Sequence, residues 1–314
     1  PDARRSLDPA AAAPAEGAGV GIYGSINKGL LQVPNMKRKS VQQEFGGLWT
    51  EQKLRLLRDY LESYMKILRK YPKLSPVYID AFAGTGDINT KSDDGEGNSS
   101  DSNLKFKGSA RVALEISDPT FRKFIFVERS RAKCQELENL KTEYPTRADR
   151  IEVVNQDAGK FLTSWCRDID RLVTRAVVFL DPFGMQVEWS LLETVAETRV
   201  IDLWLLVPIG MGPNRLLTKE DLPPDVWGDK LTKFFGTDEW KERFYRSRVQ
   251  RDLFDESSEL EKSVDHDGLR DYFLERLRTI FPGVAGNPVT QRNSTNSPMF
   301  LLCFATANPK ESTK

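Results

Sequence analysis

The sequence predicts an α/β protein whose sheet is mostly parallel. Short apolar runs alternate along the chain with amphipathic segments of helical spacing. The apolar runs are continuous, which is typical of strands that are buried on both faces. The chain has 314 residues, of which 39% are hydrophobic, so it can bury a large core. We therefore expect helices on both faces of one sheet.

The expected elements begin with a helix over residues 50–70, where apolar side chains recur at spacings of three and four. Strands and helices then alternate. The expected strands are 77–82, 123–128, 150–155, 176–180 and 201–207, and the expected helices are 109–116, 132–143, 158–168 and 191–198. Segments 288–291 and 299–306 are expected to pair as antiparallel strands near the C-terminus.

Composition limits the kind of protein and its compartment. There are 46 basic and 46 acidic residues, so a contact with nucleic acid would need a local basic patch. Cys134, Cys166 and Cys303 are far apart, and with a single histidine they cannot form a zinc site. We expect buried thiols in a reducing cytoplasm and no metal. No apolar run approaches the roughly 20 residues that a membrane helix needs.

The segment 77–86 contains the most informative turn of the chain. An apolar strand runs to Asp80, and the chain then enters a turn of small residues. Glycine lacks a Cβ, so the backbone of such a turn can approach a ligand closely. Taken alone, a glycine-rich turn is as often structural as functional. The residues expected to bind a ligand here are Asp80, Ala81, Phe82, Ala83, Gly84, Thr85 and Gly86.

Acidic side chains stand at or just after the ends of four expected strands. They are Asp80, Glu128, Asp157 and Asp181. Ligands of open parallel sheets bind outside the carboxyl ends of the strands, so these carboxylates should gather at one edge. Glu128 is placed to accept both hydroxyls of a ribose, with Arg129 beside it, and Asp157 is placed to meet an adenine edge. Singly, each acid could cap a helix or face solvent. Together they favour an adenosine-containing ligand.

The details of the turn favour S-adenosylmethionine (SAM) as that ligand. A nicotinamide fingerprint needs a third glycine, and Asn89 stands there instead. A phosphate-binding loop needs glycine before Lys91-Ser92, and Thr90 occupies that place, so a nucleotide-dependent enzyme is a weaker hypothesis. The spacing Asp-x-Phe-x-Gly-x-Gly is instead similar to SAM sites of the Rossmann-like class.

A second motif, Asp181-Pro182-Phe183-Gly184, follows the strand 176–180. It resembles the Asp-Pro-aromatic motif of amine-directed methyltransferases, including the tRNA guanine dimethyltransferases. The carboxylate of Asp181 and the carbonyl of Pro182 could accept the N–H groups of a base amine, while Phe183 stacks on the base and Gly184 lets it approach. The other interpretation is an ordinary strand-to-loop turn with a buried phenylalanine.

A broader resemblance covers about residues 45–310. The matching motifs are Phe45-Gly46-Gly47-x-Trp49-Thr50-x-x-Lys53-Leu54, the segments 78–86 and 179–189, Asp202-Leu203-Trp204, Asn214-Arg215-Leu216-Leu217 and Phe234-Phe235-Gly236-Thr237. With these motifs the chain resembles the three-Cys-motif partner protein family. The resemblance implies a Rossmann-like methyltransferase fold and a radical-SAM-like protein partner, which carries the three cysteines of the family name.

The same motifs divide the chain into expected regions. Residues 1–40 are expected to be a disordered leader or tag, 41–208 a Rossmann-like cofactor-binding core, 209–285 a helical elaboration beside the sheet and candidate substrate-binding region, and 286–314 strands that complete the sheet. The polar stretch 87–103 is expected to form a solvated loop, with a possible role as a lid. Segment 240–251 interleaves arginines with aromatics. It could follow a nucleic-acid backbone, or form an amphipathic helix that buries Trp240, Phe244 and Leu253.

These observations lead to one main hypothesis. The chain is expected to be a SAM-dependent methyltransferase that acts on an exocyclic amine of a nucleobase in RNA or DNA, in the cytoplasm. The other hypothesis is a non-catalytic subunit that keeps the SAM-binding fold and serves the three-Cys-motif protein.

Overall fold

The computed structural model describes residues 47–89, 105–252 and 255–308. The chain divides into two units, 1–42 and 43–314, and every described residue belongs to the second. The expected leader (1–40) and most of the polar stretch 87–103 lie outside the described residues. Among the helices that the structure describes, none has the length and apolar character to cross a membrane.

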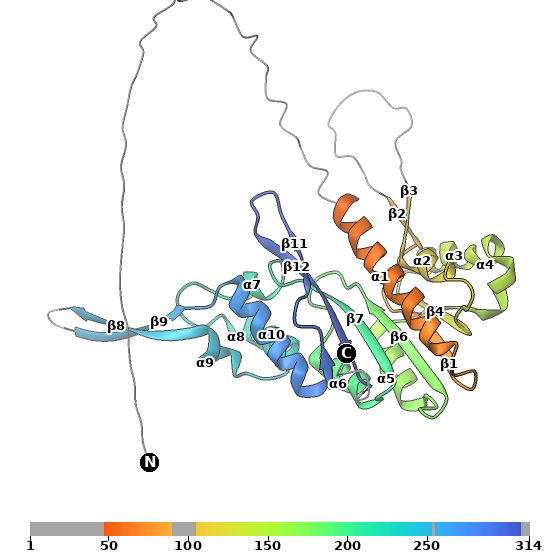
Figure 1. Cartoon of the computed structure of the whole chain (residues 1–314). Coiled ribbons are helices and arrows are strands. Elements are labelled where there is room, and N and C mark those ends of the chain that lie inside the picture. The colour runs from red at the N-terminus through yellow and green to blue at the C-terminus, as the bar shows by residue number, and fades with distance from the viewer. Residues whose placement is uncertain (1–46, 90–104, 253–254, 309–314) are drawn as a thin grey trace, which may run out of the picture. The chain divides into compact units, whose positions relative to one another are not determined.

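Within the described ranges, eight strands form one sheet in the order β10-β12-β7-β6-β1-β4-β5, with β11 also paired to β12 (Figure 1). They are β1 (Ser75–Asp80), β4 (Lys123–Glu128), β5 (Ile151–Asn155), β6 (Thr174–Leu180), β7 (Ile201–Val207), β10 (Gly283–Val284), β11 (Val289–Arg292) and β12 (Pro298–Thr306). Strands β5, β4, β1, β6 and β7 are mutually parallel, and β12 is antiparallel to β7, β10 and β11.

This strand order confirms the predicted Rossmann-like fold, with a mostly parallel sheet and a C-terminal antiparallel strand pair. From β1 the chain first builds outward through β4 to β5, and then returns to the other side of β1 with β6 and β7. The reversal creates a switch point beside β1, where open α/β sheets bind their ligands. The fold therefore places the ends of β1, β4 and β6 at the expected edge.

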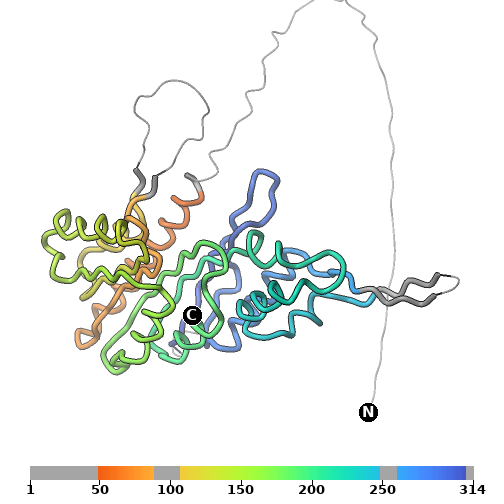
Figure 2. The backbone as a smooth tube through the Cα atoms, turned by 180° about the vertical axis from the view of Figure 1, so that it is seen from behind, coloured from red at the N-terminus to blue at the C-terminus, as the bar shows by residue number. Residues whose placement is uncertain are grey.

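Helices cover both faces of the sheet, as expected. The described helices are α1 (Gly47–Leu68), α2 (Ser109–Leu114), α3 (Arg131–Glu138), α4 (Leu140–Glu143), α5 (Ala158–Asp168), α6 (Trp189–Glu197), α7 (Pro213–Leu216), α8 (Asp225–Phe235), α9 (Trp240–Phe244) and α10 (His266–Ile280), with a 3-10 turn at Pro145–Arg150. Helices α1 to α4 share a core with one face (Figure 1), and α5, α6, α8 and α10 share a core with the other (Figure 2). Side chains that alternate along each strand supply the two cores: Tyr78 faces the first, and Val77 and Ile79 face the second.

Helix α1 forms where the sequence predicts it, but it begins at Gly47 and ends at Leu68. Leu57, Leu61 and Met65 recur every four residues and are buried against the sheet, which explains its position. The helix expected over 132–143 is divided into α3 and α4 at Asn139. There the Asn139 N–H donates to the carbonyl of Glu136, three residues back, which tightens the chain.

The segment after Trp240 differs from the helix expected over 240–251. Helix α9 ends at Phe244, and β8 (Tyr245–Asp252) pairs with β9 (Asp255–Lys262) in an antiparallel hairpin. An amphipathic helix over 240–251 is therefore wrong beyond Phe244, although Trp240 and Phe244 are buried as expected. Arginine at every second position, as at Arg246 and Arg248, is the period of a strand rather than of a helix. Leu253 lies outside the described residues.

Gly236 supports the packing of α8 on α6, and its replacement by alanine is expected to destabilise the protein. Its φ of 73° is left-handed, and a Cβ added there would lie 2.0 Å from Cδ1 of Trp189. We expect Gly236→Ala to lower the free energy of unfolding by about 3 kcal/mol, because the left-handed backbone costs about 1–2 kcal/mol and the overpacking about 1–3 kcal/mol. Urea denaturation measures the change.

The matched control is Gly286→Ala. Its added Cβ has ordinary van der Waals contact, 3.8 Å from the guanidinium of Arg278. This variant should remain within about 0.5 kcal/mol of wild type. If both variants lost the same free energy of unfolding, the close approach to Trp189 would not be the reason that position 236 requires glycine.

Candidate functional site

A cavity of about 570 Å³ opens at the carboxyl edge of the sheet, among the ends of β1, β4, β5 and β6. Six of the residues predicted to form the site line it. They are Ala81, Phe82, Glu128, Arg129, Asp157 and Phe183. The sequence places these residues far apart, and the parallel strands bring them together at one rim. The cavity is large enough to bind a small molecule.

Glu128, at the end of β4, joins the cavity to the glycine turn. The Gly84 N–H donates to Oε2 of Glu128 (3.2 Å), and the Ser130 N–H donates to Oε1 (2.8 Å). These bonds fix the carboxylate at the cavity wall. Each carboxylate oxygen has a second lone pair, so Glu128 can still accept hydrogen bonds from ligand hydroxyls.

The turn after β1 has the backbone that its glycines imply. Gly84 and Gly86 have φ values of 62° and 79°, which L-residues with a side chain rarely adopt. No atom lies within 4 Å of a Cβ built at Gly84, so this side of the turn is open. Gly86, in contrast to the open Gly84, has its backbone in contact with that of Gly108. The Gly108 N–H donates to the carbonyl of Gly86 (2.9 Å), and a Cβ at Gly108 would lie 2.7 Å from that oxygen. Gly108 was not predicted, and its role follows only from this tertiary contact.

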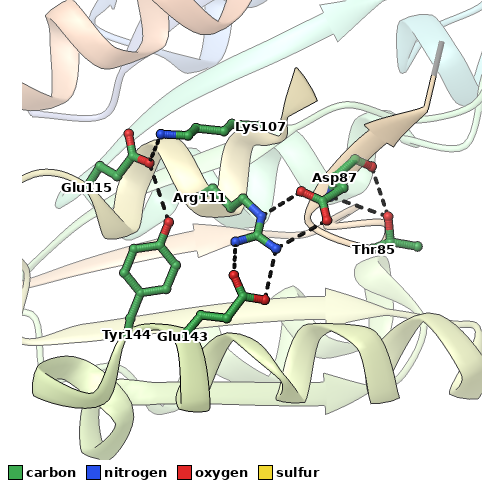
Figure 3. Close-up of polar contacts among 7 residues, drawn as sticks. All are labelled: Thr85, Asp87, Lys107, Arg111, Glu115, Glu143 and Tyr144. Atoms are coloured by element: carbon green, nitrogen blue, oxygen red, sulfur yellow. Dashed lines mark hydrogen bonds and ion pairs between the residues drawn. The ribbon is translucent and has the colours of Figure 1, made fainter. Parts of the chain in front are cut away.

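Arg111 of α2 holds the end of the same turn in place (Figure 3). Its Nε donates to Oδ1 of Asp87 (2.6 Å), at the start of β2 (Asp87–Asn89), and its other nitrogens pair with Glu143 of α4. The hydroxyl of Thr85 donates to the carbonyl of Asp87 (2.9 Å). A planar guanidinium between two carboxylates fixes both by geometry as well as charge. The hairpin of β2 and β3 (Lys105–Lys107) is thereby tied to α2 and α4.

Asp157 has a position that suits both of the roles that the sequence allows, helix N-cap and ligand-binding residue at the cavity. It is the N-cap of α5, where its Oδ1 accepts the Lys160 N–H (3.1 Å), and it also lines the cavity. A capping carboxylate can accept further hydrogen bonds at its remaining lone pairs. Capping therefore fixes the side chain and leaves it available to a ligand.

Phe183 is not the buried aromatic of an ordinary turn. Its exposed fraction is 79%, at the rim of the cavity, and Nζ of Lys133 lies 5.8 Å from its ring centroid. Gly184 follows with a φ of 72°. Pro182 and Gly184 do not line this cavity; they line a separate small apolar space together with Phe234. An exposed ring at a cavity rim is a surface on which a planar group can stack.

Asp80 lies beneath the turn and does not line the cavity. It is fully buried, where Ser109 Oγ donates to Oδ2 and the Phe82 N–H donates to Oδ1 (3.3 Å). Burial is the main cause that raises the pKa of Asp80 from 3.8 to about 7; the hydrogen bond from Ser109 opposes the rise and the charge of Asp181 adds to it. The structure therefore gives Asp80 a role in shaping the turn. Ala83, Gly84, Thr85 and Gly86 likewise form the turn without lining the cavity.

Asp181 has a partner that the sequence interpretation missed. Its Oδ2 forms an ion pair with Nζ of Lys53, on α1. The signal was present in the sequence, because Lys53, Leu57 and Leu61 recur every four residues along the apolar face of one helix. A lysine in such a stripe is buried on folding and needs a charged partner. Only the fold shows that this partner is Asp181.

No family model matches the sequence, and no curated protein matches it. Among solved structures, a Legionella pneumophila protein of the DUF519 family is 11% identical with a TM-score of 0.43, covering 82% of this chain and 83% of its own. A SAM-dependent methyltransferase from Agrobacterium tumefaciens is 10% identical with a TM-score of 0.38, covering 83% of this chain and 62% of its own.

A methyltransferase from Geobacter sulfurreducens is 14% identical with a TM-score of 0.31, covering 68% of this chain and 79% of its own. At TM-scores below 0.5, these likenesses decide neither the fold nor the activity of this chain. The fold described above rests on its own strand order, and that order is the Rossmann-like one.

Proposed function

We propose that this protein transfers a methyl group from SAM to an exocyclic amine of a nucleobase in RNA or DNA. One observation carries the proposal: Glu128, Asp157 and Phe183 line the same cavity, and Asp181 begins the turn that presents Phe183. Groups suited to a nucleoside and groups suited to an amine therefore occur together at one edge of the sheet.

The cavity wall offers the groups that a SAM molecule needs. Glu128 would accept the ribose hydroxyls, and Asp157 would accept from the amino group at the adenine edge. The open side of Gly84 lets the charged end of the cofactor approach the backbone of the turn. When bound, SAM supplies an electrophilic methyl group on a sulfonium. These contacts would orient that methyl group toward the turn 181–184.

The turn after β6 suits an amine whose lone pair is delocalised into a base. Asp181 and the carbonyl of Pro182 would accept its N–H bonds, which draws electron density toward nitrogen and makes it a better nucleophile. Phe183 would stack on the base, a contact worth about 1–3 kcal/mol. Such a base must be single-stranded or flipped from a duplex to reach the cavity.

Calorimetric titration with SAM is the first test. We expect wild type to bind and Gly84→Arg to lose binding, because the new side chain occupies the open side of the turn. Glu128→Gln should weaken binding by at least about tenfold, since the loss of charge removes a hydrogen bond worth roughly 1.5–3 kcal/mol. Glu239→Gln, which changes an exposed glutamate outside the cavity lining, is the matched control and should bind as wild type does.

Transfer of labelled methyl to total RNA or DNA is the second test, carried out with and without the expected radical-SAM-like protein partner. Label in a base amine supports the proposal. SAM binding with no transfer to any nucleic acid, even with the partner present, would instead favour the non-catalytic subunit. Absence of SAM binding would exclude both functions.

A further inference from the structure

The ion pair of Lys53 with Asp181 joins α1 to this edge of the sheet and is largely shielded from solvent. The exposed fraction of the Lys53 side chain is 9%, and that of Asp181 is 28%. Lys53 lies on α1, which precedes every strand of the sheet and packs across it (Figure 1). A helix outside the β-α repeats thus reaches the motif that follows β6.

The surroundings of Lys53 fix its ammonium group in one place. Nζ lies 5.8 Å from the ring centroid of Phe179, on β6, and pairs with Oδ2 of Asp181, just beyond the end of that strand. An aromatic face and a carboxylate both attract a cation, so both contacts favour this position of Nζ. In the part of the chain that the structure describes, Oδ1 of Asp181 accepts no hydrogen bond.

We propose that Lys53 is a positioning residue of this site: it holds Oδ2 of Asp181 and leaves Oδ1 to accept an N–H of the base amine. The inference rests on the proposed function and deepens it. A carboxylate that is free to rotate would present either oxygen to the amine, in several orientations. A carboxylate bound at one oxygen presents the other in a single orientation, which is the preorganisation that a reacting amine requires.

A purely structural role explains this ion pair less well. Burying two charges costs several kcal/mol per ion, and a pair of apolar side chains of similar size often stabilises a fold as well or better. Helix α1 has another ion pair, between Arg58 and Glu115 (2.7 Å), which is the C-cap residue of α2. Apolar side chains such as Leu57 and Leu61 already dock the helix. The buried charge pair is placed instead at the turn that would bind the amine.

The test compares Lys53→Met, Lys53→Arg and Arg58→Met. We expect Lys53→Met to bind SAM as wild type does and to lower kcat of methyl transfer about 10- to 100-fold, as when a partner that orients a site side chain is removed. Lys53→Arg keeps the cation and should restore most of the rate. Arg58→Met removes an ion pair of the same helix away from the cavity and should leave kcat unchanged. In an Asp181→Asn background, Lys53→Met should lower kcat no further.

Crystal structures of the variants test the positioning without any assay of methyl transfer. In Lys53→Met, the Asp181 side chain should leave the orientation of wild type or occupy several. An unchanged Asp181 side chain, or a wild-type kcat in folded Lys53→Met, would overturn the inference. Should Lys53→Met not fold, Lys53→Gln carries the same comparison. If wild type transfers no methyl group, the proposed function fails, while the orientation of Asp181 in the crystals still decides the role of Lys53.

Discussion

Asp181→Asn is expected to lower kcat of methyl transfer by about 100-fold or more, with little change in the affinity for SAM. The amide has no negative charge to draw the lone pair of the amine outward, and loss of one such preorganised group costs about 10²–10³ in kcat. Asp181 does not line the cavity in which the cofactor is proposed to bind, so binding should persist. Labelled-methyl kinetics and SAM calorimetry on the same preparation measure the two quantities.

Asparagine is the informative replacement because of Lys53. Asp181→Ala would leave the buried ammonium of Lys53 without its carboxylate, and an uncompensated buried charge costs about 3–5 kcal/mol of stability. Asp181→Asn keeps an oxygen for that ammonium. A folded Asp181→Asn protein that methylates at the wild-type rate would contradict the role given to this carboxylate.

The stability of the protein is expected to fall as pH rises through the range in which Asp80 ionises. Burial raises the pKa of Asp80 from 3.8 to about 7, so between these values the folded chain binds a proton that the unfolded chain has released. Stability therefore decreases with rising pH across this window. The difference corresponds to about 4 kcal/mol, at about 1.4 kcal/mol per pKa unit.

Asp80→Asn isolates this contribution. The amide can keep the contacts with the Phe82 N–H and the Ser109 hydroxyl while carrying no charge. Urea denaturation should show the variant gaining stability relative to wild type from about pH 4 to pH 7, and no further gain above that. The exposed Asp238→Asn is the control and should show no such trend. A constant difference between wild type and Asp80→Asn at pH 5 and pH 8 would contradict a raised pKa.

Burial sets most of the rise in the pKa of Asp80, and the charged groups around it modify that rise. The charge of Asp181 raises the pKa of Asp80 further. Lys53 acts in the other direction and lowers the pKa of Asp80. Replacement of Lys53 by methionine should therefore move the pH window of the Asp80 effect upward. The same denaturation series measures that shift.

Local pattern was sufficient for most elements of the core. The strand Lys123–Glu128 and the helix Ala158–Asp168 have the bounds that their patterns predict. A strand that is buried on both faces has a continuous apolar sequence, and the start of the helix is marked by its N-cap residue, Asp157. The hairpin of β8 and β9 was missed. The aromatics Trp240 and Phe244 just before it favour a helix, whereas the arginines at alternate positions within it have the period of a strand.

Sequence alone determined the α/β class, the glycine turn after β1 and the carboxylates at the strand ends, because strand period, backbone freedom and strand-end position are local properties. Tertiary structure alone decided that Glu128 bonds Gly84, that Gly108 meets Gly86 and that Lys53 pairs with Asp181. Each of these contacts joins segments that are separate along the chain. Their geometry depends on which strands become neighbours and on where α1 crosses them, and no short stretch of sequence specifies either.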